Sequence, residues 1–152
     1  RRQVATTDEE VKETYVERLN TGLPFRVKFC MRQFPVWFSF RGNGAVDLSA
    51  GKGAAICGRY LKDEVLLEIA RDQLYFTGGK NPFGQSLIYG EGSNYAQQYA
   101  AHCGETVGEI PVGIQTRVNE DVPYWPMANN ATYKEIWMTS AGHWMRLLAD
   151  LY

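Results

Sequence analysis

The chain of 152 residues has few of the residues that build metal sites or disulfide frameworks. Its three cysteines, Cys30, Cys57 and Cys103, are odd in number and far apart, which fits neither a zinc motif nor a dense disulfide scaffold. One disulfide stays open as an alternative. The two histidines, His102 and His143, have no Cys or Asp at ligand spacing. The sequence therefore predicts no metal site, and it calls for no organic cofactor.

Charge runs and long apolar runs are absent as well. Sixteen basic and seventeen acidic residues give a net charge of -1, and the basic residues are scattered. Nucleic acids and anionic membranes are bound through clustered basic side chains, so neither is an expected partner. No stretch reaches the roughly 18 apolar residues of a membrane span, and no Walker pattern is present. The chain begins without a Met or a signal peptide, which fits a fragment or a processed product.

The first third of the chain contains one predicted helix and one predicted extended segment. Thr7 and Glu10 have the spacing of a capping box, which predicts a helix from Asp8 to Leu19. The segment from Leu23 to Phe40 is rich in Phe, Val and Trp and is interrupted by prolines. It is expected to form an extended, largely buried connection.

A helical hairpin is predicted next. The stretch from Ala45 to Leu61 is dense in Ala and Gly, and each internal Gly costs roughly 1 kcal/mol of helix propensity. Such small residues allow close approach of a neighbouring helix, so this is expected to be a tightly packed inner helix with Cys57 buried. Asp63 is expected to cap a second helix that runs to about Thr77 and ends at Gly78-Gly79. Its predicted apolar face consists of Val65, Leu66, Ile69, Ala70 and Leu74.

The remaining chain reads as a long irregular segment followed by one helix. Gly79 to Trp125 is rich in Gly, Pro and aromatics, and a loop of this length is usually functional. The last helix is expected to start near Tyr133 and run to the end, with His143 in a packed or interfacial position. Its predicted apolar face consists of Trp137, Ala141, Trp144, Leu148 and Leu151. Strands are few and short, which predicts an all-α architecture whose long loops gather at one end.

Glu135 is the sharpest chemical candidate, and two interpretations compete for it. It lies at the predicted entrance of the last helix, beside Tyr133 and Trp137, where burial would suit a general acid. Thr132 three residues earlier would instead make Glu135 part of a capping box. Spacing alone favours the cap.

Further candidates lie on the long loop. Glu120 and Asp121 precede a Tyr-Trp pair, Tyr124 and Trp125, so the carboxylates could bind sugar hydroxyls while the rings stack. They could equally be solvated loop charges. Tyr89 is a further aromatic on this loop.

Four blocks of the sequence resemble glycoside hydrolase family nine, the cellulase-like inverting enzymes. The segment ARDQLYFTGGKNPFGQS, from Ala70 to Ser86, resembles that family's A-x-x-Q-L-x-Y-x-L-G-R-N-P-x-G-x-S-Y segment. The Ala/Gly-rich helix before Arg59–Asp63 is similar to its penultimate hairpin, and Gly108–Gly113 to its glycine-rich loop. Tyr133 to Leu151 is similar to its closing helix. The match runs from about Phe38 to the end in the family's order.

The resemblance implies the C-terminal part of an (α/α)6 barrel, with residues 1–152 as a partial catalytic domain. It places Glu135 on the proton donor, and the catalytic base would be an Asp upstream of residue 1. The isolated chain would then be inactive, and its partners would be a carbohydrate and the N-terminal part of the barrel. The compartment implied is secreted or periplasmic. The expected substrate-binding residues are Tyr89, Glu120, Asp121, Tyr124, Trp125 and Tyr133.

The sequence also departs from the family. The family's His-His-Arg cluster has no counterpart in Asn94–Cys103, which argues against cellulose and leaves a related glycan. Six-hairpin folds also host polysaccharide lyases, and fold does not fix reaction. A non-catalytic carbohydrate-binding or structural helical domain, with Glu135 as a cap, is the other alternative.

Overall fold

The computed structural model describes residues 23–25, 29–31, 34, 42–99, 104, 106–116 and 122–152. The predicted helix Asp8–Leu19 and most of the connection Leu23–Phe40 lie outside these residues. Outside them also lie four side chains singled out by the sequence: His102, Cys103, Glu120 and Asp121.

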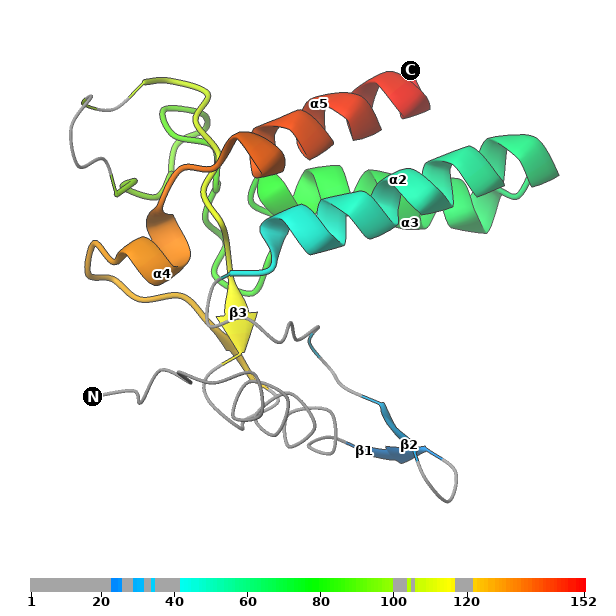
Figure 1. Ribbon diagram of the computed structural model, residues 1–152, viewed down its shortest axis with the longest axis horizontal. Helices are drawn as coiled ribbons and strands as arrows, with labels where there is room; N and C mark the ends of the chain where they lie inside the picture. The colour runs from blue at the N-terminus through cyan, green and yellow to red at the C-terminus, as the bar shows by residue number, and fades with distance from the viewer. Residues whose placement is uncertain are drawn as a thin grey trace, which may run out of the picture.

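The described part is mainly helical, as the all-α prediction requires (Figure 1). Three long helices, α2 (Gly44–Leu61), α3 (Glu64–Thr77) and α5 (Met138–Leu151), lie side by side, and α4 (Ala131–Lys134) is a single turn. Helix α2 contacts both α3 and α5. No helix in the described ranges is long and apolar enough to cross a membrane.

Two short antiparallel strand pairs accompany the helices. Strand β1 (Leu23–Phe25) pairs with β2 (Phe29–Met31), with Pro24 opposite Cys30. Strand β3 (Gln115–Thr116) pairs with β4 (Pro123–Tyr124), with Gln115 opposite Tyr124. Part of the predicted extended connection is thus a small hairpin.

The predicted hairpin of α2 and α3 is confirmed with nearly the predicted ends. The chain turns at Lys62, which adopts a left-handed conformation with φ 56°. The Asp63 side chain then caps α3 by accepting hydrogen bonds from the backbone N–H groups of Val65 at 2.9 Å and Leu66 at 3.2 Å. Gly78 follows the last residue of α3. Local signals fix the ends of the two helices at this turn, because the cap and the turn involve residues adjacent in sequence.

Of the three glycines in the middle of α2, two allow close packing against neighbouring side chains. Gly51 and Gly58 are buried, and a Cβ atom on Gly58 would lie 2.9 Å from Leu67 Cγ. Gly53 is exposed, and a Cβ atom there would meet nothing within 4 Å. The tightly packed inner helix is therefore confirmed along the face that carries Gly51 and Gly58.

Two predictions about this hairpin are wrong. Cys57 is exposed rather than buried, because it lies roughly 200° around α2 from the buried Ala55. The apolar face of α3 is also split. Ala70 and Leu74 lie in the core, whereas Val65 is 65% exposed and Ile69 is 46% exposed. Helix α3 contacts α2 and α5, and these two neighbours cover only part of its apolar surface.

The predicted single helix from Tyr133 to the end is also wrong. Helix α4 ends at Lys134, and α5 begins only at Met138. On α5, Leu147 is fully buried and packs with Trp144 and Leu151, while the predicted core residue Leu148 is 37% exposed. Of the predicted face, Trp144 and Leu151 therefore pack on the core, and Leu147 occupies the place expected of Leu148.

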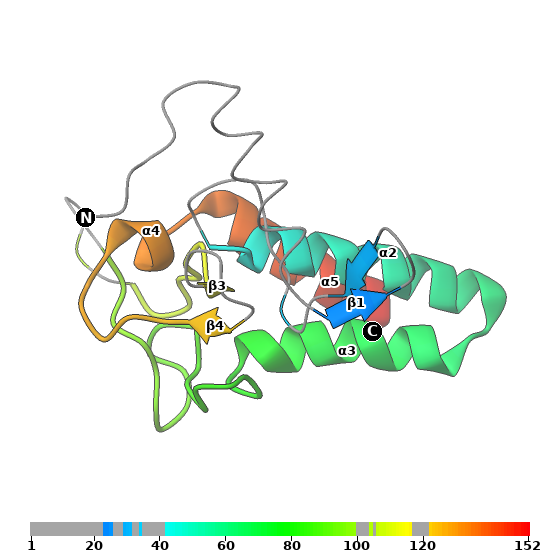
Figure 2. The ribbon, with the colours of Figure 1, turned by 90° about the horizontal axis from the view of Figure 1, so that it is seen from below.

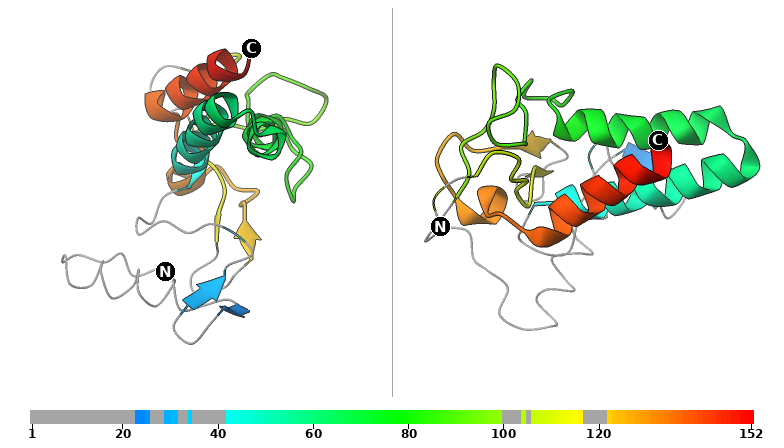
Figure 3. Two further views of the ribbon diagram at one scale, coloured as in Figure 1. Left: turned by 90° about the vertical axis from the view of Figure 1, so that its right-hand side faces the viewer. Right: turned by 90° about the horizontal axis from the view of Figure 1, so that it is seen from above.

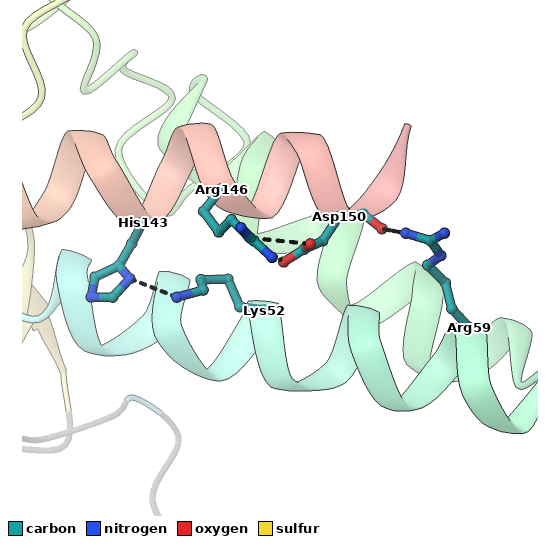
Figure 4. A network of polar contacts seen from close by, with 5 residues as sticks. All are labelled: Lys52, Arg59, His143, Arg146 and Asp150. Carbon is teal, nitrogen blue, oxygen red and sulfur yellow. Dashed lines mark hydrogen bonds and ion pairs between the residues drawn. The ribbon is translucent and has the colours of Figure 1, made fainter.

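Polar contacts join α2 to α5 along a parallel seam (Figure 4). The Lys52 ammonium lies 3.2 Å from His143 Nδ1. About two turns further along, the Arg59 guanidinium donates to the backbone carbonyl of Asp150 at 3.1 Å. Within α5, Arg146 donates to the Asp150 carboxylate at 3.3 Å. His143 therefore lies at a helix–helix contact, as predicted for a packed or interfacial histidine.

The long loops gather at one end of the helices, together with α4 (Figures 2 and 3). Two hydrophobic clusters match this division. One lies between the helices and contains Leu48, Ala55, Ala70, Leu74 and Leu147. The other lies under the loops and contains Phe34, Leu87, Ala96, Ile114, Trp125 and Tyr133.

Asp47 is an unusual feature of the first turn of α2. Burial raises the pKa of its carboxyl group from the ordinary 3.8 to about 7. A helix N-terminus favours a carboxylate by typically about 0.3–1 kcal/mol, so the loss of hydration at this half-buried position outweighs the helix dipole. The folded protein therefore binds this proton more tightly than the unfolded chain does.

Replacement of Gly58 by Ala should destabilise the fold, while the same change at Gly53 should stabilise it. The new Cβ at position 58 would crowd Leu67 and the Asp63 carbonyl, at a cost of about 1–2 kcal/mol. At position 53 the added methyl group meets nothing and gains up to about 1 kcal/mol of helix propensity. Urea unfolding followed by circular dichroism measures both. Equal stabilisation by the two changes would contradict the close packing of α2 on α3.

Replacement of Asp47 by Asn should stabilise the protein in a pH-dependent way. Because the folded-state pKa is raised, the wild type loses stability as the pH rises from about 4 to about 7. At about pH 8 the Asn variant should be more stable by on the order of 2 kcal/mol, allowing for partial exposure, and below about pH 4 the two proteins should be equal. Denaturant unfolding at both pH values measures this difference. A gain that is the same at both values would exclude the burial of this charge as its cause.

Candidate functional site

Glu135 lies in an extended segment between two helices. It has φ -62° and ψ 134°, and Trp137 has φ -126° and ψ 129°. The cap of α4 is Asn130, whose side-chain oxygen accepts a hydrogen bond from the backbone N–H of Thr132 at 2.8 Å. Both sequence interpretations assumed that Glu135 begins a helix, and it instead follows the last residue of one. The predicted capping box of Thr132 and Glu135 is therefore wrong.

Backbone hydrogen bonds from two distant loops hold this segment. The Tyr99 N–H donates to the Lys134 carbonyl at 2.9 Å, and the Val112 N–H donates to the Glu135 carbonyl at 2.9 Å. Tyr99 forms a parallel bridge with Glu135, and Pro111 forms an antiparallel bridge with Ile136. These bonds satisfy backbone groups that a continuous helix would have used internally. They account for the break between α4 and α5.

The same loop is anchored to the start of α2. The Asn43 N–H donates to the Ile114 carbonyl at 2.9 Å, and the Gly44 N–H donates to the Val112 carbonyl at 2.8 Å. The backbones approach so closely that a Cβ atom on Gly42 would overlap the Gly113 carbonyl. Gly113 itself has φ 98°, a conformation that favours glycine. The turn before α2 thus helps to fix the loop that holds Glu135.

The side chains of the segment alternate between two faces. Successive residues of an extended chain point to opposite sides, so Glu135 and Trp137 share one face and Ile136 takes the other. The Trp137 indole N–H donates to Glu135 Oε2 at 2.9 Å, in agreement with this arrangement. On the other face, Ile136 is partly covered and its bridge partner Pro111 is buried. The inner face therefore supports the segment and leaves Glu135 and Trp137 on the outer face.

Two aromatic rings accompany Glu135 on that outer face. Residues paired directly across a bridge place their side chains on the same side, which puts Tyr99 beside Glu135. Tyr99 and Trp137 are each 37% exposed, and Glu135 is half-buried. No local pattern in the sequence indicates Tyr99, and Trp137 was expected on the apolar face of a helix. The bridge between Tyr99 and Glu135 places these residues together, and its two partners are too far apart in the sequence to be predicted from local patterns.

Three aromatic residues that were expected to bind substrate lie mainly in the interior instead of on the outer face. Trp125 and Tyr133 are only 7% and 5% exposed and belong to the core under the loops. Tyr124 is half-buried and packs edge-to-face on Tyr133, with ring centroids 5.3 Å apart. The structure brings these three rings together, but as packing beneath the segment that carries Glu135. Trp125 and Tyr133 therefore lack the open ring face that stacking on a sugar requires.

Lys134 is buried against the same group of aromatic side chains. It is 3% exposed, and its ammonium donates to the Met127 carbonyl at 3.1 Å and lies 5.3 Å from the centre of the Trp125 ring. Burial lowers the pKa of this lysine. An ammonium so placed ties the segment before Glu135 to the preceding loop and to Trp125.

The Asn-Pro-Phe-Gly-Gln block is a scaffold for the loops. The Asn81 amide donates to the Phe76 carbonyl at 2.9 Å and to the Gln85 carbonyl at 2.8 Å, which closes the turn after α3. Gln85 in turn accepts the Trp125 indole N–H at 2.9 Å. Within this block, Asn81 thus holds the turn and Gln85 positions Trp125.

Tyr89 lies on a separate part of the loop end. Its ring meets Tyr95 edge-to-face at 5.3 Å, and its backbone N–H donates to the Glu109 carbonyl at 3.0 Å. Glu120 and Asp121 lie outside the described residues. Within the ranges that are described, no group of three or more His, Cys, Asp or Glu residues is arranged to hold a metal ion.

Comparison with known proteins gave no match: no family model, no curated protein and no solved structure resembles this chain significantly.

Proposed function

We propose that this chain is the C-terminal portion of an inverting glycoside hydrolase, in which Glu135 is the proton donor. One observation carries the proposal. Glu135 sits on a segment held by backbone hydrogen bonds to two loops. Its carboxyl group accepts a hydrogen bond from the Trp137 indole N–H, and Tyr99 is its backbone bridge partner. A carboxyl group placed in this way, without a capping role, matches the acid of a glycosidase.

The proposed reaction consumes one water molecule. Glu135, in its protonated form, gives its proton to the glycosidic oxygen, and the bond from that oxygen to the anomeric carbon breaks with its electrons going to oxygen. A water molecule adds to the anomeric carbon from the opposite face and loses a proton to the catalytic base. That base is an Asp outside this chain, and inversion requires the two carboxyl groups to be roughly 6.5–9.5 Å apart. No cofactor is needed for these steps.

Exposed apolar side chains support the remaining part of a six-hairpin barrel as the partner of this chain. Val65 and Ile69 on α3 are open to solvent, as are Met138 and Met145 on α5. A groove of about 460 Å³ also runs between α3 and α5, lined by Leu74, Tyr75, Gly78, Lys80, Trp144, Leu148 and Tyr152. Exposed apolar surface of this kind often marks an interaction site, and the helices of the N-terminal part of the barrel are the proposed cover.

Replacement of Glu135 by Gln in the intact enzyme tests the proposal. The amide cannot donate a carboxylic proton, so kcat on an oligosaccharide should fall by about 10²–10⁴-fold. The melting temperature should stay close to that of the wild type, because Glu135 is half-buried and ends α4 through its backbone N–H, which the substitution keeps. Glu91→Gln is the matched control, since Glu91 is an exposed carboxylate on the same loop end.

Retained turnover in Glu135→Gln would contradict the proposal, as would an equal loss in Glu91→Gln. The stereochemistry of the first-formed product, measured by NMR, separates inversion from retention. An unsaturated product, detected by its ultraviolet absorbance, would assign the chain to the lyases.

A further inference from the structure

We propose that Asn130 is an N-glycosylation site, at which the chain accepts an oligosaccharide from a lipid-linked diphosphate donor. Asn130, Ala131 and Thr132 form the acceptor sequence Asn-x-Thr, with a small residue other than Pro in the middle. Asn130 is the only asparagine of the chain that stands two residues before a Ser or a Thr. The proposal goes beyond the proposed function and holds whether or not Glu135 is a catalytic acid.

The folded structure keeps Asn130 on the surface, as a bulky modification requires. Asn130 and the three residues before it are exposed, and Met127 is 95% exposed. Helix α4, which begins after Asn130, lies at the opposite end of the molecule from the turn between α2 and α3 (Figure 2). A glycan on Asn130 therefore extends into solvent from an exposed turn.

The oxygen and the nitrogen of the Asn130 side-chain amide are used differently. Oδ1 accepts a hydrogen bond from the backbone N–H of Thr132 at 2.8 Å and thereby caps α4. Nδ2, the atom to which the sugar is attached, makes no hydrogen bond in the described part of the chain. The amide thus presents its nitrogen to solvent while its oxygen holds the turn.

The neighbouring Asn129 provides a direct contrast. Its Nδ2 donates a hydrogen bond to the Gln98 carbonyl at 3.1 Å, so its amide nitrogen is engaged in the fold. It also has Ala131, which carries no hydroxyl group, two positions later. Of these two adjacent asparagines, the one with the acceptor sequence is therefore also the one whose amide nitrogen is available.

The turn at Asn130 is formed by residues adjacent in sequence. A side-chain oxygen that bonds the backbone N–H two residues on closes an Asx-turn, which needs no support from distant segments. The Thr132 hydroxyl makes no hydrogen bond within the described ranges, so it too is available for recognition. A nascent chain can therefore present the amide and the hydroxyl together before the rest of the fold is complete.

The proposed transfer leaves the cap of α4 unaltered. Nδ2 of Asn130 forms a bond to the anomeric carbon of the first sugar. The bond from that carbon to the diphosphate oxygen breaks, and its electrons leave with the lipid diphosphate. One N–H proton of the amide passes to a base of the transferase. The product keeps one N–H and the carbonyl oxygen Oδ1, which remains the acceptor for the Thr132 N–H.

The test maps the peptide that contains Asn130 by mass spectrometry, before and after treatment with peptide N-glycosidase. It uses the intact protein purified from the cells that naturally make it and, for the variants, the same protein secreted by a eukaryotic host. We expect a glycan on this peptide of the wild type, and the enzyme should remove it with conversion of Asn130 to Asp.

Two variants should lose the glycan completely, and two should keep it. Asn130→Asp removes the acceptor nitrogen but retains the cap, because Asp is as good an N-cap as Asn. Thr132→Ala keeps the acceptor and removes the hydroxyl, whereas Thr132→Ser restores the acceptor sequence and should be glycosylated. Asn129→Asp is the matched control and should be glycosylated like the wild type.

An unmodified Asn130 in the naturally made protein would overturn the proposal. Sugar that remains on this peptide in Asn130→Asp, or a full level of modification in Thr132→Ala, would also overturn it. None of these measurements involves turnover, so they fail or succeed independently of the Glu135→Gln test of the proposed function.

Discussion

The bridge between the segment after α4 and two distant loops is the constraint on which the loop end of this protein depends. The backbone N–H of Val112 donates a hydrogen bond to the Glu135 carbonyl, and that of Tyr99 donates one to the Lys134 carbonyl. With these groups engaged, the chain cannot continue as a helix from α4 into α5. The break turns Glu135 and Trp137 to the outer face and Ile136 to the inner face. Every proposed role of Glu135 follows from this change of direction.

The bridge is connected to the helical core through the start of α2. The backbones of Asn43 and Gly44 bond to the same loop that holds Glu135, and glycines at 42 and 113 allow the close contact. The helices pack through small residues and a polar seam, whereas the loops pack on Trp125 and Tyr133. A rigid helical layer thus supports an irregular layer in which a carboxyl group can be placed accurately, an arrangement common in enzymes.

Sequence reasoning predicted the features that depend on neighbouring residues. The cap at Asp63 and the small residues of α2 are local signals, and the hairpin lies where they indicated. The errors share a different cause. The final helix was predicted as continuous because its break arises from pairing with residues 99 and 111–112, far away in the sequence. The extended backbone that this pairing imposes leaves Trp137 37% exposed, whereas Trp125 packs in the cluster under the loops.

The most direct test of the central claim is a crystal structure of the intact enzyme with a non-hydrolysable oligosaccharide spanning the cleavage site. The account predicts that a carboxyl oxygen of Glu135 lies about 3 Å from the atom that replaces the glycosidic oxygen. It also predicts an upstream Asp carboxyl group roughly 6.5–9.5 Å from that of Glu135, on the opposite side of the sugar. A sugar bound with Glu135 out of reach of the scissile bond would contradict it.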